Sequence, residues 1–137
     1  MQEVIPDRIQ LHQKSASLEL DYGDQGIYHL SAEFLRVHSP SAEVKGHGRG
    51  QEVLQTGKRD VAIVAVAGVG SYAIRLDFDD GHNTGLYSWS YLWELCSSQE
   101  TLWQRYLASL AAAGASRDAL PADTQVISIK PAPPAPE

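Results

Sequence analysis

The chain has 137 residues, of which 43% are hydrophobic and 20% charged, and its formal net charge is −6. This length suits one domain with tails, and the composition excludes a fibrous or wholly disordered protein. The acidic balance argues against nucleic-acid binding, because binders of phosphate usually present a basic surface. No apolar run approaches the roughly 18 residues that cross a bilayer, and the first ten residues lack a signal-peptide pattern. We therefore expect a cytoplasmic protein without membrane partners.

Alternating apolar and polar residues predict three antiparallel strands at the start of the chain. A lead-in over residues 1–7 contains Pro6, and apolar side chains then recur at every second position. Glycine-rich and polar residues separate these stretches, as expected for tight turns. The expected strands are residues 9–12, 17–21 and 27–30.

A short helix and a long loop are expected next. Ser31 is a good N-cap for a helix over residues 32–36, and Pro40 prevents this helix from continuing. Residues 39–57 are rich in glycine and polar side chains and show neither helical nor strand periodicity. The sequence therefore predicts a loop without structure of its own, a kind of segment that is often functional in small domains.

The stretch from 61 to 89 predicts the centre of the fold. Residues 61–67 are apolar at nearly every position, which is typical of a central strand covered on both faces. Residues 68–71 predict a tight turn into a second strand over residues 72–78. Residues 79–85, DDGHNTG, combine turn-forming glycine with Asx-type side chains. We predict that this turn carries the functional site.

Two helices are expected after this turn. Ser88 can cap the first of them. Ser97 and Glu100 have the spacing of a capping box for the second, which should run to Gly114. The single cysteine, Cys96, cannot form an internal disulfide and is expected to be a buried, inert thiol.

These elements predict an α+β fold, namely a small, mainly antiparallel β-sheet domain with two or three short helices, a C-terminal helix and an extended tail. The lead-in covers residues 1–7 and the single domain covers residues 8–114. Residues 115–137 are expected to form a flexible tail rich in proline and alanine.

The most distinctive parts of the sequence are AEFLRVHSPSAE at 32–43, VGSYAI at 69–74 and DGHNTGLYSW at 80–89. Through these segments the chain resembles the gamma-butyrobetaine hydroxylase-like N-terminal domain family, over about residues 6–95. The resemblance implies a small bacterial stand-alone member with a mainly β fold and a few helices. Such domains also precede iron- and 2-oxoglutarate-dependent carnitine-pathway hydroxylases and are attached to some iron–sulfur cluster carrier ATPases. In neither fusion does the module itself carry the chemistry.

For the hydroxylase version, the resemblance implies a structural zinc site made of three cysteines in a C-x-C-x-x-C arrangement and the histidine of the DGH turn. Thiolates and an imidazole can close a tetrahedral zinc shell. The matching positions in this chain are Ser39, Ser41, Val44 and His82. Serine hydroxyls are poor zinc ligands and valine offers none, so no metal or other cofactor is expected there. We predict instead that hydrogen bonds join His82 to the two serines.

Three functions remain open from the sequence. The first is a non-catalytic accessory or interaction module with an unidentified protein partner, linked to iron–sulfur or metal-enzyme systems as the family's fusions imply. The absence of a nucleophile–base pair and of a phosphate-binding loop favours this function over catalysis.

The other two functions are binding functions. The second is a metal-binding protein or small metal-dependent enzyme holding zinc or iron. Its candidate ligands are His38, His47, Asp80 and His82. The third is an anion-binding domain that closes its glycine-rich loop over an acidic small molecule. Its candidate cations are Arg36, Lys45 and Arg49.

Overall fold

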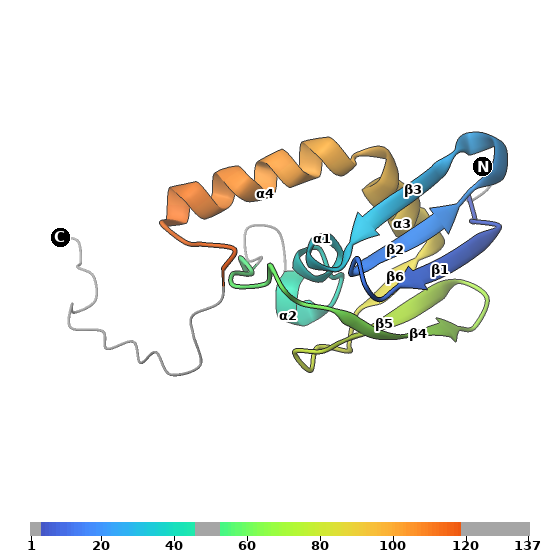
Figure 1. Ribbon diagram of the computed structural model, residues 1–137, viewed down its shortest axis with the longest axis horizontal. Helices are drawn as coiled ribbons and strands as arrows, with labels where there is room; N and C mark the ends of the chain where they lie inside the picture. Colours follow the sequence, from blue (N-terminus) through green and yellow to red (C-terminus); the bar gives the residue numbers. More distant parts are fainter. Residues whose placement is uncertain (1–3, 46–52, 119–137) are drawn as a thin grey trace.

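A computed structural model describes residues 4–45 and 53–118 of the chain. It contains two three-stranded antiparallel sheets with helices packed around them, which confirms the predicted α+β class (Figure 1). Within these two ranges no helix is both long and apolar enough to span a bilayer. The elements in chain order are β1 (Arg8–His12), β2 (Ser17–Asp21), the 3-10 turn η1 (Gly23–Gln25), β3 (Ile27–Ser31), α1 (Ala32–Val37), α2 (Ala42–Lys45), β4 (Ile63–Val69), β5 (Ala73–Phe78), β6 (Leu86–Ser88), α3 (Trp89–Ser97) and α4 (Gln99–Ala113).

The first sheet has the order β1-β2-β3, as the alternation of residues predicts. Its register pairs Leu18 with Leu30 and Leu20 with Tyr28, so that apolar side chains share one face. The three leucines are fully buried. Glu19 lies between two of them and therefore points to the opposite face. This sheet has one apolar face toward the core and one polar outer face.

The second sheet has the order β4-β5-β6, and its first strand differs from the prediction. The apolar run at 61–67 predicts a central strand covered on both faces, but β4 lies at the edge and β5 is central. Val64 is 54% exposed, and the pairing register of β4 with β5 shifts between Ile63 and Ala65. The run combines alanine with valine and isoleucine and leaves part of these side chains exposed, whereas Ile74, Leu76 and Phe78 of β5 are buried in the core.

The helix α1 begins as predicted, because Ser31 Oγ accepts a hydrogen bond from the backbone N–H of Phe34 at 3.0 Å. The segment after α1 contains a short helix, α2, where the sequence predicts a loop without structure. The Ser41 carbonyl accepts hydrogen bonds from the backbone N–H groups of Val44 and Lys45 at 2.9 and 2.8 Å. A single helical turn is too short to produce a periodic pattern, so the sequence does not reveal it.

The helix α3 is capped as predicted, since Ser88 Oγ accepts a hydrogen bond from the backbone N–H of Tyr91 at 3.2 Å. The capping box predicted for α4 is wrong. Ser98 occupies the N-cap position of α4, and no side-chain hydrogen bond caps this helix. Ser97 still belongs to α3, and its hydroxyl donates to the Trp93 carbonyl at 2.8 Å.

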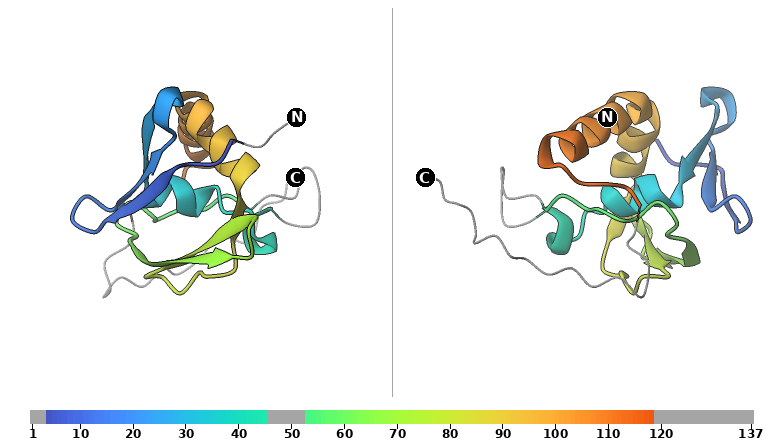
Figure 2. Two further views of the ribbon diagram at one scale, coloured as in Figure 1. Left: turned by 90° about the vertical axis from the view of Figure 1, so that its right-hand side faces the viewer. Right: turned by 60° about the vertical axis from the view of Figure 1, so that its left-hand side comes forward.

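One hydrophobic core joins both sheets to α1 and α3, and the left view of Figure 2 shows the two sheets as separate layers. Leu76 from β5, Tyr87 from β6, Leu35 from α1 and Leu92 from α3 are each 0% exposed. Cys96 also belongs to this core, and burial raises the pKa of its thiol to about 11. The expectation of a buried cysteine is therefore confirmed.

The helix α4 extends beyond the sheets, and the residues after it return to α1 (Figure 1). Arg117 Nε and Nη2 donate to the two carboxylate oxygens of Glu33 at 2.8 and 2.7 Å. Glu33 is 5% exposed, and the guanidinium lies 4.9 Å from the centre of the Trp103 ring. This bidentate ion pair fastens residues 115–118, the first part of the predicted tail, to the domain. Residues 119–137 lie outside the described residues.

Candidate functional site

The turn predicted to carry the site, residues 79–85, links β5 to β6. The backbone N–H of Phe78 donates to the His82 carbonyl at 2.9 Å, and Gly81 supplies a φ of 90°, which favours glycine. Asp80 Oδ1 accepts a hydrogen bond from the backbone N–H of His82 at 3.1 Å, in the manner of an Asx turn. The side chains and glycine of this turn therefore fix the backbone around His82.

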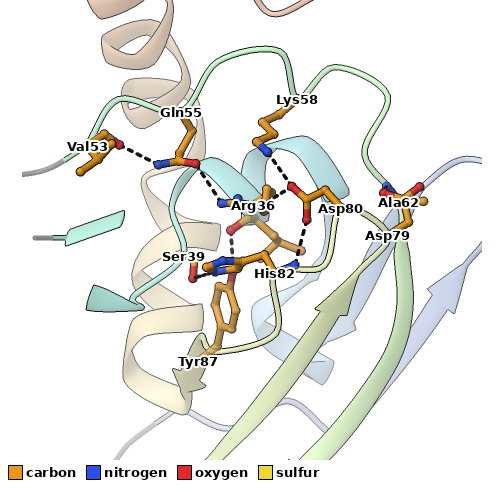
Figure 3. A network of polar contacts seen from close by, with 11 residues as sticks. Arg36, Ser39, Val53, Gln55, Lys58, Ala62, Asp79, Asp80, His82 and Tyr87 are labelled. Atoms are coloured by element: carbon orange, nitrogen blue, oxygen red, sulfur yellow. Dashed lines mark hydrogen bonds and ion pairs between the residues drawn. The ribbon is translucent and has the colours of Figure 1, made fainter. Parts of the chain in front are cut away.

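A largely buried serine–histidine cluster, formed by Ser39, Ser41, His82 and Thr84, joins this turn to the segment after α1. His82 Nε2 and Ser39 Oγ are hydrogen-bonded at 2.8 Å across 43 residues of sequence (Figure 3). These two residues are 5% and 0% exposed. Ser39 Oγ also accepts the backbone N–H of Ser41 at 3.3 Å, and Ser41 Oγ lies 2.7 Å from Thr84 Oγ1. The hydrogen bond predicted between His82 and this segment is present at Ser39.

Beside the cluster, Asp80 pairs with two cations (Figure 3). Its Oδ2 accepts hydrogen bonds from Arg36 Nε at 2.9 Å and Lys58 Nζ at 2.6 Å. Arg36 is 8% exposed, and its Nη1 donates to Gln55 Oε1 at 3.1 Å. Burial alone would raise the pKa of Asp80, but the hydrogen bonds from the two cations and from the His82 N–H outweigh burial and lower it to about 2.

We expect Asp80 to make the domain less stable in acid. Its folded-state pKa of about 2 lies below the ordinary value of 3.8, so its contribution is complete above pH 3.8 and is lost as the pH falls toward 2. Because the side chain is partly exposed, solvent screening limits this contribution to on the order of 1 kcal/mol. Urea denaturation of the wild type and of Asp80→Asn across this pH range measures it. Unfolding free energies that fall equally in both proteins would contradict the assignment to Asp80.

Two tyrosines hold the end of α1. The Tyr87 hydroxyl donates to the Leu35 carbonyl and the Tyr91 hydroxyl donates to the His38 carbonyl, both at 2.5 Å. Burial raises the pKa of both hydroxyls, so they remain protonated donors. The backbone that leads into the serine–histidine cluster is therefore held by hydrogen bonds from β6 and α3.

The positions that match the family's zinc ligands are only partly brought together. Ser39 contacts both His82 and Ser41, while Val44 is 5% exposed in α2. This arrangement offers one imidazole, two hydroxyl groups and an apolar side chain. Such a donor set does not fit a four-ligand zinc site, which needs thiolates, imidazoles or carboxylates.

The alternative metal set of His38, His47, Asp80 and His82 is dispersed where it is described. His38 Nδ1 lies 2.9 Å from the Phe34 carbonyl oxygen, and burial lowers the pKa of this imidazole. The Asp80 carboxylate is occupied by its two cations. His47 lies outside the described residues. The described members of this set therefore have separate local partners.

The predicted anion-binding cations also have separate surroundings. Arg36 is buried in its ion pair with Asp80. Lys45 is exposed, and its Nζ lies 5.1 Å from the centre of the Tyr91 ring. Arg49 lies outside the described residues. Of the two described cations, only Lys45 is accessible to a partner or ligand.

The structure is thus a small α+β module of two three-stranded sheets. Its DGH turn is hydrogen-bonded, through His82, to Ser39 in the segment that follows α1. The family model described as gamma-butyrobetaine hydroxylase-like, N-terminal, matches residues 9–93. The chain therefore belongs to this family, as the segments of its sequence predicted. No curated protein gives a significant match.

Solved structures of similar proteins have the same fold. One solution NMR structure is 52% identical, with a TM-score of 0.77, and the match covers 92% of this chain and 99% of that one. A second is 46% identical, with a TM-score of 0.71 and coverage of 90% and 93%. A crystal structure of a protein of unknown function from Acidithiobacillus ferrooxidans, in the DUF971 family, is 38% identical. Its TM-score is 0.56, and the match covers 67% of this chain and 92% of that one.

The structure also contains a side-chain group that the sequence analysis missed. His12, Glu19 and His29 each offer a potential metal-ligand atom, and these three atoms lie within 4.8 Å of one another. In residues 4–45 and 53–118 no other three histidine, cysteine, aspartate or glutamate side chains converge in this way. All three lie at outward positions of predicted strands, but only the register between the strands shows that they meet.

Proposed function

We propose that the protein is a non-catalytic accessory module that acts in the cytoplasm and binds a protein partner of an iron–sulfur or metal-enzyme system. An open hollow of about 460 Å³ between the ends of α1 and α2, the segment at 53–55 and α4 carries this proposal. Its apolar lining includes Val44, Val53, Leu54 and Leu102. Val53 and its neighbour Leu54 are 52% and 36% exposed, so two adjacent apolar side chains of this hollow are accessible in the part of the chain that the structure describes.

The charge of the hollow indicates the chemistry of the partner. Lys45 and Arg105 lie at its lining, and none of the described residues that line it is acidic, although the whole chain carries a net charge of −6. Such a surface complements a protein segment with apolar side chains next to aspartate or glutamate. We therefore expect the partner to present an acidic, apolar segment.

The internal hydrogen bonds of the serine–histidine cluster favour a structural role for that cluster. Among the described residues, every buried side-chain nitrogen or oxygen has a hydrogen-bond partner. His82 is the one family ligand position that retains a metal-binding side chain, and its Nε2 is hydrogen-bonded to Ser39. The cluster thus supports the segment that leads to α2, and α2 forms part of the hollow.

Two matched variants test the proposal. Val53→Asp places a carboxylate in the hollow, whereas Val64→Asp makes the same change on the outer side of β4 at nearly equal exposure, 52% against 54%. Partners are captured from native lysate with each tagged protein, and the candidate is then purified and titrated. We expect Val53→Asp to weaken its affinity at least about tenfold, as hot-spot substitutions do, and Val64→Asp to leave it unchanged.

Equal binding by wild type and Val53→Asp would contradict the proposal. Metal analysis of the purified protein separates it from the metal-binding alternative at the DGH turn. Stoichiometric metal that disappears in His82→Ala would favour that alternative, because the loss would assign the ion to this turn.

A further inference from the structure

We propose that the outer face of the first sheet binds zinc or a similar divalent transition-metal ion through His12, Glu19 and His29. This site lies on different elements from the serine–histidine cluster and from the hollow. It therefore does not depend on the proposed interaction with a protein partner.

The register of the sheet brings the three side chains together. The strand β2 lies between β1 and β3 (Figure 1). Glu19 is directly opposite His29, while His12 is opposite Ser17, two positions away from Glu19. Since residues two apart on a strand share a face, all three side chains rise from the polar outer face.

The distances between the ligand atoms suit a shared ion. Glu19 Oε1 lies 2.8 Å from His12 Nε2 and 3.4 Å from His29 Nε2, and the centres of the two imidazole rings are 6.2 Å apart. Zinc binds imidazole nitrogen and carboxylate oxygen at about 2.0–2.2 Å in a tetrahedron, which places neighbouring ligand atoms about 3.3 Å apart. Small side-chain rotations are enough to bring the three atoms around one ion.

The donor chemistry selects the class of metal. Two imidazoles and one carboxylate form the protein ligands of many catalytic zinc sites and of mononuclear iron(II) sites. The Irving–Williams order places zinc and copper above manganese and iron for such nitrogen-containing sites.

The exposure of the side chains leaves the site open to solvent. The Glu19 side chain is 14% exposed at the base of the group, whereas those of His12 and His29 are 42% and 59% exposed. An ion bound here would retain at least one position for water or for a ligand from another molecule. It would also connect β1 to β3, two strands that are not hydrogen-bonded to each other.

Zinc titration of the full, chelator-treated chain tests this site. We expect calorimetry to show one zinc ion per chain. Two-dimensional ¹H–¹⁵N spectra of the histidine rings should show shifts for His12 and His29 and none for His38 and His82. His12→Ala and His29→Ala should each weaken binding at least about 100-fold, since the loss of even an outer hydrogen-bonding partner of a metal ligand typically costs 10–100-fold.

Two further variants keep the test decisive. His47→Ala should bind zinc as the wild type does. Gln10→His places an imidazole directly opposite Glu19 on the same face as His12, and it should tighten binding at least about tenfold by supplying a fourth ligand. Circular dichroism confirms that each variant is folded. The proposal is overturned if the folded wild type binds no zinc, if binding survives loss of both His12 and His29, or if His47→Ala abolishes it.

Discussion

Replacing Ser39, Ser41 and Val44 together with cysteine is expected to create a zinc site with His82. Ser39 Oγ already lies 2.8 Å from His82 Nε2, and the other two positions lie in the adjoining segment and in α2. Three thiolates and one imidazole are a preferred tetrahedral zinc set. Without metal, loss of the Ser39–His82 hydrogen bond should destabilise this variant by about 1–2 kcal/mol relative to the wild type.

With zinc, the triple variant should become more stable than the wild type. Structural zinc binds zinc-finger peptides with about 10–16 kcal/mol of free energy, so even a fraction of this value raises the melting temperature of a domain of this size by about 10 °C or more. Thermal melts with zinc and with chelator measure the difference, and cobalt substitution reports thiolate coordination. The control adds His82→Ala to the triple variant and should lose most of the gain. Melts that do not respond to zinc would show that these positions do not converge as a site.

Gly85→Ala is expected to cost about 3 kcal/mol or more of unfolding free energy, at the upper end of the range for overpacked sites. A Cβ at Gly85 would collide with Ser39 Oγ and would lie 3.3 Å from Pro40 Cδ and 3.4 Å from Tyr87 Cε1. Ser39 is 0% exposed and hydrogen-bonded to His82, so it cannot move aside without breaking the cluster.

Gly68→Ala is the matched control for this substitution. Gly68 lies in β4, and a Cβ built there meets no atom within 4 Å. Its replacement should change stability by less than about 1 kcal/mol, in either direction. If the collision with Ser39 is the cause, Ser39→Gly should restore much of the loss in the double variant with Gly85→Ala. Urea unfolding of the wild type, Gly85→Ala, Ser39→Gly and the double variant completes this cycle. If the two substitutions have additive effects on the unfolding free energy, the collision with Ser39 is not the cause of the cost of Gly85→Ala.

Local sequence chemistry was sufficient to predict much of the fold. Ser31 and Ser88 cap helices because their hydroxyls reach the backbone N–H three residues later, a contact that depends on a few neighbouring residues. The turn at 79–85 is likewise fixed by its own Gly81 and Asp80. Both the resemblance to the family and the position of His82 followed from such short segments.

The features that the sequence did not reveal depend on distant residues or on ambiguous patterns. The Arg36–Asp80 ion pair spans 44 residues, and nothing local to either residue predicts its partner. The strand β4 is apolar enough for a central strand, yet it lies at the edge of its sheet. Its position depends on packing against distant parts of the chain, which its own sequence does not show. The group of His12, Glu19 and His29 was predictable only in part. Their strands were predicted, but the register that brings the three side chains together was not.

The ion pair between Arg117 and Glu33 determines how far the chain can be shortened. The family match ends at residue 93, whereas Arg117 lies beyond α4. A protein cut after α4 but before Arg117 would leave the Glu33 carboxylate without its counter-ion, and removing one partner of a buried ion pair typically costs about 3–5 kcal/mol. The smallest unit that folds independently should therefore extend through Asp118. The family match ends earlier and omits α4 and the residues that lead from α4 back to α1.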